Sequence, residues 1–146
     1  MNDELVVPIR SDQDMVAARA QCRALAETLR FSRTDATLIA TAISEVARNI
    51  LIHAGEGEIS MRAVREEMRY GLVVTARDTG PGIRDVATAL ESGRAATGRL
   101  GLGLPGARRL MDQFEVESSP GNGTIVTMAK WRIRDELERL RDRARA

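Results

Sequence analysis

Residues 34–53 read TDATLIATAISEVARNILIH, and this stretch decides how the chain folds. Aliphatic side chains recur along it at spacings of four, three and four residues: Ile39, Ile43, Val46 and Ile50. A second row with helical period lies beside the first: Ala42, Glu45, Asn49 and His53. The two rows predict a helix, capped by Ser32 or Thr34, that buries one face and lines a site with the neighbouring face.

The segments around this helix alternate between strand and helix patterns. Before it, Leu5 to Ile9 is an apolar run broken by Pro8, which predicts an edge strand, and Ser11 caps a helix that ends near Arg30. After it we expect, in order, strands 58–64 and 68–77, a loop 78–82, a short helix 84–91, a glycine loop 101–106 that opens a helix, strands 114–117 and 124–131, and a helix 133–146. No repeat or linker interrupts this order, so one α+β domain is predicted.

Composition limits the classes of function. The chain has 146 residues, of which 43% are hydrophobic and 29% charged, as in an ordinary globular domain. A net charge of +1 provides no field that would attract nucleic acid, and 3% aromatic residues are too few for base stacking.

The remaining whole-chain features concern cysteine and targeting. The one cysteine, Cys22, lies in an apolar helical row, so we expect it in the core. The acidic first residues carry no apolar signal segment, and no apolar run is long enough to span a bilayer. We therefore expect a cytoplasmic protein with neither nucleic-acid nor membrane partners.

Glu45 and Asn49 stand one helical turn apart and project side by side. A carboxylate can accept a proton from a hydroxyl group, and an amide oxygen can join the octahedral shell of Mg²⁺. Taken alone, the pair also fits the polar surface of an ordinary helix.

The segment Asp78-Thr-Gly80-Pro-Gly82 follows a predicted strand. An aspartate there can accept a hydrogen bond from the exocyclic amine of adenine, and the glycines let the backbone turn sharply beside a ligand. The same residues also suit a plain strand-to-loop turn.

The segment Gly101-Leu-Gly103-Leu104-Pro-Gly106 formally matches a dinucleotide-binding fingerprint. The match is poor, because a small polar stretch stands where a strand should precede the loop and no suitable acid follows about 20 residues later. A glycine loop leading into a helix is still a natural phosphate seat. The motifs of P-loop enzymes and of ordinary protein kinases are absent.

Two further residues are open to two interpretations each. Thr124 follows Gly123 at the start of a strand and could reach a bound base, or could simply favour strand formation. His53 could accept a phosphoryl group, but fits better as a helix-end residue near the negative end of the helix dipole.

These motifs in this order resemble the GHKL ATPase superfamily, which includes gyrase B, MutL-type proteins, histidine kinases and anti-sigma-factor kinases. The resemblance covers residues 34–131, and residues 42–50 and 100–112 are similar to the RsbT-like switch serine kinases of the bacterial stressosome. It implies a Bergerat fold: a two-layer sandwich of a mixed, mostly antiparallel sheet with helices on one face. It also implies ATP and Mg²⁺ in a pocket closed by residues 83–97.

The resemblance assigns roles by position. Glu45 would be the catalytic base and Asn49 the magnesium ligand, while Asp78 would read adenine with help from Thr124. Gly80 and Gly82 would line the base pocket. The phosphates would be wrapped by the glycine loop and its neighbours: Gly98, Gly101, Leu102, Gly103 and Leu104.

The implied function is an ATP-dependent serine/threonine protein kinase of a partner-switching stress response. Such kinases phosphorylate STAS-domain scaffold or antagonist proteins, and then bind the N-terminal region of a PP2C-type phosphatase and activate it. One alternative is a nucleotide-dependent anti-sigma factor that acts mainly by sequestration. Another is the catalytic domain of a histidine kinase or a dimer-gated ATPase, which the length of the chain disfavours.

The division expected from the resemblance is an ATP-binding kinase domain over 1–131 and a charged helical extension over 132–146. Ile133, Leu137 and Leu140 give the extension only a narrow apolar stripe. We expect a solvated helix there, with docking of a partner as the alternative.

Overall fold

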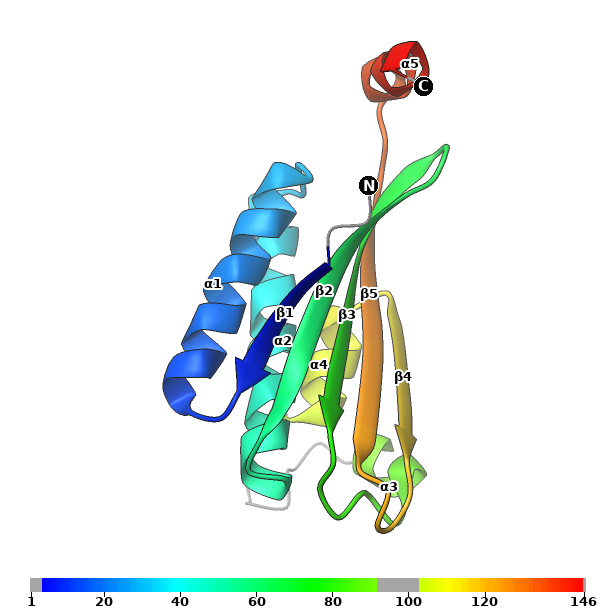
Figure 1. Cartoon of the computed structure of the whole chain (residues 1–146). Coiled ribbons are helices and arrows are strands. Elements are labelled where there is room, and N and C mark those ends of the chain that lie inside the picture. The colour runs from blue at the N-terminus through cyan, green and yellow to red at the C-terminus, as the bar shows by residue number, and fades with distance from the viewer. Residues whose placement is uncertain (1–3, 92–102, 146) are drawn as a thin grey trace.

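The computed structural model describes residues 4–91 and 103–145 as a two-layer α+β sandwich (Figure 1). Five strands form one sheet in the order β1-β2-β3-β5-β4. The strands are β1 (Glu4–Ile9), β2 (Gly57–Arg65), β3 (Arg69–Asp78), β4 (Gln113–Ser118) and β5 (Thr124–Ile133). The helices are α1 (Asp12–Thr28), α2 (Arg33–His53), α3 (Val86–Glu91), α4 (Leu104–Leu110) and α5 (Glu136–Arg145).

The predicted sandwich is confirmed, with helices α1, α2 and α4 on one face of the sheet (Figure 1). The sheet differs from the expectation in one respect. All the strand pairings among the described residues are antiparallel, so the sheet is not mixed there. Neighbouring strands run in opposite directions whether a short turn joins them, as between β2 and β3 and between β4 and β5, or a longer connection through helices separates them. The described sheet therefore contains no parallel crossover.

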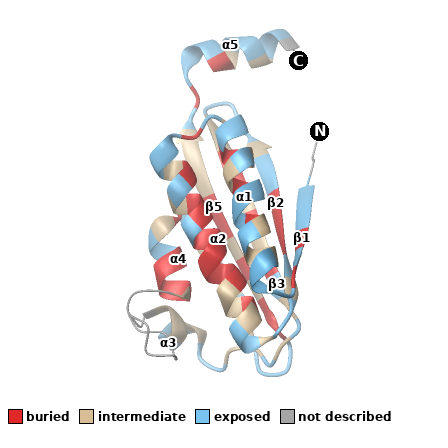
Figure 2. Cartoon of the chain, turned by 90° about the vertical axis from the view of Figure 1, so that its left-hand side faces the viewer, coloured by how far each residue is buried: buried red, intermediate tan, exposed pale blue. Residues whose placement is uncertain are grey.

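The core lies between α2 and the centre of the sheet (Figure 2). All four aliphatic residues of the predicted α2 stripe are fully buried, at no more than 1% exposure. They pack with Ile59 and Met61 of β2, Leu72 and Val74 of β3, and Met128 of β5 in one cluster. Cys22 of α1 joins this cluster, as expected from its row, and burial of its thiol raises its pKa to about 12.

Both long helices are capped by serines, Ser11 as predicted and Ser32 out of the two predicted candidates, Ser32 and Thr34. The Ser11 hydroxyl accepts a hydrogen bond from the Asp14 N–H at 3.3 Å, and the Ser32 hydroxyl accepts one from the Asp35 N–H at 3.0 Å. α2 then runs to His53, its last and exposed residue. Among the helices that the structure describes, none is long and apolar enough to cross a membrane.

The two ends of the sandwich are distinct (Figure 1). At one end lie the C-terminal residues of α2 and β3, the first residue of β5, and α3. At the other end β5 continues past the predicted limit to Ile133 and leads to α5, beside the turn between β2 and β3. Candidate site residues therefore gather at the first end and the C-terminal extension at the second.

Candidate functional site

Glu45 projects from the middle of α2 and is only 5% exposed, although it is charged. Both of its carboxylate oxygens are engaged. Oε1 accepts a hydrogen bond from Arg48 Nη1 at 2.6 Å, and Oε2 accepts one from the backbone N–H of Gly103. A buried carboxylate needs such partners, since its charge is otherwise costly to desolvate. The contact with Gly103 joins α2 to the start of α4.

Asn49 lies one turn after Glu45 on the same side of α2 and is half-buried. Its side chain makes no hydrogen bond to another residue in the described part of the chain. A half-buried amide with free hydrogen-bonding capacity is available to a ligand. The carboxylate and the amide thus lie along one helix, as predicted. The carboxylate of Glu45 is hydrogen-bonded, and the amide of Asn49 has no partner among the described residues.

Asp78 is the last residue of β3, where it pairs with Gly57 of β2 and Thr124 of β5. Its Oδ1 accepts a hydrogen bond from the Gly80 N–H at 3.0 Å, so the carboxylate closes the turn that follows the strand. This turn fixes the orientation of the carboxyl group. Oδ2 has no hydrogen-bond partner among the described residues.

The glycines after Asp78 are required by close packing. A Cβ on Gly80 would stand 2.6 Å from the Cβ of Ala54, the residue that caps α2. Gly82 has φ +81°, and a Cβ there would stand 2.0 Å from the carbonyl oxygen of Ser119. The loop therefore runs directly against the end of α2 on one side and the turn between β4 and β5 on the other.

Thr124 is buried at 5% exposure, and its hydroxyl is 2.8 Å from that of Ser118. The Ser118 hydroxyl also accepts a hydrogen bond from the Ile83 N–H at 2.7 Å. Ser118 therefore ties the loop after Gly82 to the start of β5. Sequence reasoning missed this residue because its position opposite Thr124 depends on strand pairing.

Arg48 is the second residue that sequence reasoning missed. Its position three residues after Glu45 was a signal that could have been used, because residues at that spacing on a helix can form an ion pair.

The glycine loop is described from Gly103 onward. Gly103 has φ 84° and ψ −154°, a conformation that is essentially restricted to glycine, and it caps α4. Leu104 is the first residue of α4 and is buried. Gly98, Gly101 and Leu102, predicted to bind phosphate, lie outside the described residues, as do residues 92–97 of the predicted closing segment.

The donor set at this end of the sandwich suits a magnesium nucleotide. An amide oxygen at Asn49 is a hard ligand of the kind that Mg²⁺ accepts alongside phosphate oxygens and water. The free oxygen of Asp78 can accept a hydrogen bond from an amine. Glu45 supplies a carboxylate beside a glycine backbone that permits close approach.

A family profile and several curated proteins match most of this chain. A sequence profile described as "Histidine kinase-like ATPase domain" matches residues 9–130. "Serine/threonine-protein kinase RsbT" of Bacillus subtilis (strain 168) is 45% identical over 131 residues, which cover 90% of this chain and 98% of the relative. "Anti-sigma F factor" of Caldanaerobacter subterraneus subsp. tengcongensis is 33% identical over 127 residues, which cover 84% and 89%.

The match by profile includes all three segments that carry the candidate site, and it ends before α5. The fold agrees with this match, and the chain belongs to the family of histidine kinase-like ATPase domains.

Proposed function

We propose that this protein is an ATP-dependent serine/threonine protein kinase of a bacterial partner-switching system. One observation supports the proposal most: Glu45 is buried beside the glycine backbone at Gly103, one helical turn from the open amide of Asn49. The 45% identity to a relative named as a serine/threonine-protein kinase supports the same activity.

Bound ATP and Mg²⁺ would supply the phosphoryl group and the positive charge that stabilises its transfer. The chain itself would do three things. Asp78 would accept a hydrogen bond from the adenine amine through the oxygen that the Gly80 turn leaves free. Asn49 would hold the metal through its amide oxygen. Glu45 would take the proton from the serine or threonine hydroxyl of the substrate.

The ion pair with Arg48 bears on the role of Glu45. In this structure Arg48 and the Gly103 N–H occupy both carboxylate oxygens. Each carboxylate oxygen keeps a second acceptor site, and a hydroxyl group that approaches Oε1 would share this oxygen with the Arg48 guanidinium. Arg48 is on the surface side of the pair, with a side chain 29% exposed against 6% for Glu45. We propose that Arg48 moves away when the substrate hydroxyl approaches.

The experiment compares phosphoryl transfer from labelled ATP to a STAS-domain protein for the wild type and Glu45→Gln. This substitution keeps the size of the side chain and removes its basicity, so the transfer rate should fall about 10²- to 10⁴-fold while ATP still binds. Glu27→Gln, at an exposed glutamate of α1, is the control and should transfer normally. Unimpaired transfer by Glu45→Gln would remove Glu45 as the base.

The names of the other relatives favour a second candidate function. Several are "Anti-sigma F factor" proteins at 29% to 36% identity, so the main output could be nucleotide-dependent sequestration of a sigma factor. Binding separates the two functions. If a sigma factor is bound in the presence of ATP with an affinity that Glu45→Gln does not change, and no STAS protein is phosphorylated, sequestration is the function.

The later step of the pathway is also a proposal. After phosphorylating its STAS substrate, the kinase would leave the scaffold and bind the N-terminal region of a PP2C-type phosphatase. Phosphatase activity should then rise on addition of this protein, and prior addition of unphosphorylated STAS protein should suppress the increase.

A further inference from the structure

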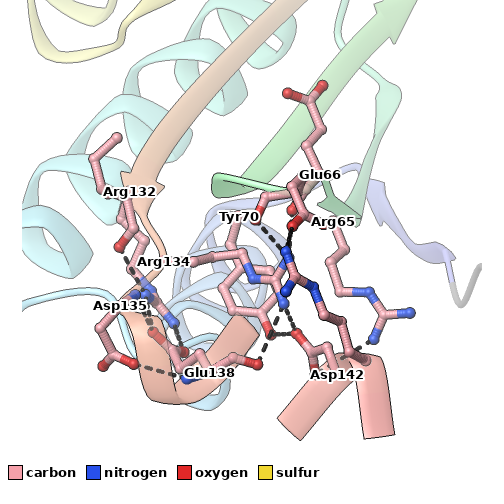
Figure 3. Close-up of polar contacts among 11 residues, drawn as sticks. Arg65, Glu66, Tyr70, Arg132, Arg134, Asp135, Glu138 and Asp142 are labelled. Carbon is pink, nitrogen blue, oxygen red and sulfur yellow. Dashed lines mark hydrogen bonds and ion pairs between the residues drawn. The ribbon is translucent and has the colours of Figure 1, made fainter. Parts of the chain in front are cut away.

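Side-chain hydrogen bonds join distant segments at both ends of the sandwich. At the end that bears α5, Arg132 of β5 donates from both terminal nitrogens to the buried carboxylate of Glu138 (Figure 3). Asp142 pairs with Arg134 and accepts a hydrogen bond from the Tyr70 hydroxyl. α5 is therefore held by its charged face, contrary to the simple solvated helix that we expected. The contacts at the opposite end bear on the candidate nucleotide site.

Three polar side chains stand in one row across that opposite end of the sheet. Thr124 of β5 pairs directly with Asp78 of β3 on one side and with Ser118 of β4 on the other. Directly paired residues of antiparallel strands project from the same face of the sheet, with their side chains close together. The Ser118 hydroxyl therefore lies two strands from the carboxylate that we propose for adenine, with Thr124 between them.

The hydrogen bonds of Ser118 fix the positions of two protons. Its oxygen lies 2.8 Å from the carbonyl oxygen of Gly123 and 2.8 Å from the hydroxyl oxygen of Thr124, and it accepts from the Ile83 N–H at 2.7 Å. A carbonyl can only accept, so the single hydroxyl proton of Ser118 is directed to Gly123. The contact with Thr124 needs a proton as well, and the Thr124 hydroxyl supplies it. The proton and both lone pairs of the Ser118 oxygen are then in use.

This arrangement leaves Thr124 able to accept a hydrogen bond but not to donate one. Its only hydroxyl proton is directed to Ser118, and its oxygen accepts no hydrogen bond from another described residue. Oδ2 of Asp78, beside it in the row, is a second acceptor without a partner among the described residues. Two neighbouring acceptors favour a ligand group that carries two N–H protons, such as the exocyclic amine of adenine, and they oppose a carbonyl oxygen.

We infer that Ser118 is a positioning residue for base selection: it takes the proton of Thr124 and so makes Thr124 an acceptor for the adenine amine beside Asp78. The inference rests on the proposed function, because it requires an adenine nucleotide at this end of the sheet. Ser118 acts on the base only through Thr124, which lies between it and Asp78. Without the Ser118 hydroxyl, Thr124 can turn its proton toward a carbonyl oxygen, and the preference for adenine falls.

Calorimetric Kd values for ATP and for inosine triphosphate, which carries a carbonyl oxygen in place of the amine, test this inference. The wild type should prefer ATP, and Ser118→Ala should reduce that preference about 2- to 10-fold, the range for one neutral hydrogen bond. Loss of the contacts with Ile83 and Gly123 weakens the binding of both nucleotides together, and the ratio of the two Kd values cancels that common effect. Ser118→Thr retains the hydroxyl and should retain the ratio. Ser119→Ala, at the exposed next residue, is the matched control and should also retain it.

A second set of variants tests whether Ser118 acts through Thr124. Thr124→Val keeps the shape of the side chain and removes its hydroxyl, so this variant should itself prefer ATP less than the wild type does. Adding Ser118→Ala to Thr124→Val should then leave the ratio of Kd values unchanged. An unaltered ratio in Ser118→Ala or in Thr124→Val alone, or an equal effect of Ser118→Ala in both backgrounds, would overturn the inference.

The same measurements separate this inference from the proposed function. A wild type that binds neither nucleotide would overturn both. A wild type that binds ATP and phosphorylates a STAS protein, but whose base preference does not respond to Ser118→Ala, would overturn the role of Ser118 alone. A base preference that falls in Ser118→Ala, in a protein that phosphorylates no STAS protein, would support the role of Ser118 and refute the kinase activity.

Discussion

Replacing Asp78 with asparagine tests directly whether this carboxylate reads the adenine base. Oδ1 is occupied by the Gly80 N–H at 3.0 Å, and asparagine retains an oxygen that can keep this turn. The other oxygen becomes an NH₂ group, which cannot accept a hydrogen bond from the adenine amine. The substitution therefore removes one contact with the base and leaves the local backbone in place.

The expected size of the effect follows from the kind of hydrogen bond that is lost. A hydrogen bond to a charged group contributes about 1.5–3 kcal/mol. Since each 1.4 kcal/mol corresponds to a factor of ten in affinity, the Kd for ATP should rise about 10- to 150-fold. Isothermal titration calorimetry in the presence of magnesium measures this change. Asp12→Asn, in the exposed first turn of α1, is the control and should bind as the wild type.

A nucleotide with a carbonyl in place of the adenine amine sharpens the test. The wild type should bind the inosine nucleotide more weakly than ATP, because a carboxylate and a carbonyl are both acceptors. Asp78→Asn should lose this preference, because its NH₂ group can donate to the carbonyl. If the variant binds ATP within about twofold of the wild type and still discriminates between the two bases, Asp78 does not read the base.

Four further substitutions and one chemical treatment test other parts of the structure. Asn49→Ala should abolish the increase in ATP affinity that magnesium provides, as measured by calorimetry with and without the metal; an undiminished increase would exclude Asn49 as its ligand. Gly123→Ala combines a φ of +72° with a Cβ 2.2 Å from a carbonyl oxygen, so the free energy of unfolding should fall by about 1–3 kcal/mol in urea titrations. Gly121→Ala, with φ +82° and no atom within 4 Å, isolates the backbone strain and should cost less. The hydrogen bond from Arg132 lowers the pKa of Glu138 from 4.5 to about 2. The stabilisation that this hydrogen bond gives the folded protein is therefore complete above pH 4.5 and is lost as the pH falls through 2. Glu138→Gln should therefore be less stable than the wild type near neutral pH, with a difference that narrows in acid; a constant difference would contradict this linkage. The thiol of Cys22, buried and with its pKa raised to about 12, should resist alkylation until the protein unfolds, and rapid labelling of the native protein would show that α1 opens readily.

Local patterns in the sequence were sufficient for the elements of this fold. The period of Ile39, Ile43, Val46 and Ile50 predicted α2, because burial on one side of a helix requires that spacing. Ser11 marked the start of α1 correctly, because its hydroxyl satisfies a backbone N–H three residues later. For α2 the sequence left Ser32 and Thr34 as candidates, and Ser32 is the cap. The polar row beside the stripe, and the order of the glycine motifs, pointed to the family that the comparisons show.

Contacts between distant segments required the tertiary structure. Asp78 lies opposite Thr124 only because β5 inserts between β3 and β4, and the Glu45 carboxylate meets the Gly103 N–H across 58 residues of sequence. The C-terminal extension, residues 132–146, shows most clearly what the sequence pattern alone leaves undecided. Its sequence contains both a charged face and an apolar stripe, and the pattern by itself favoured burial of neither. The side chains of Arg132, Arg134 and Tyr70 decide the outcome, because they offer the charged face partners that no residue within the helix could supply.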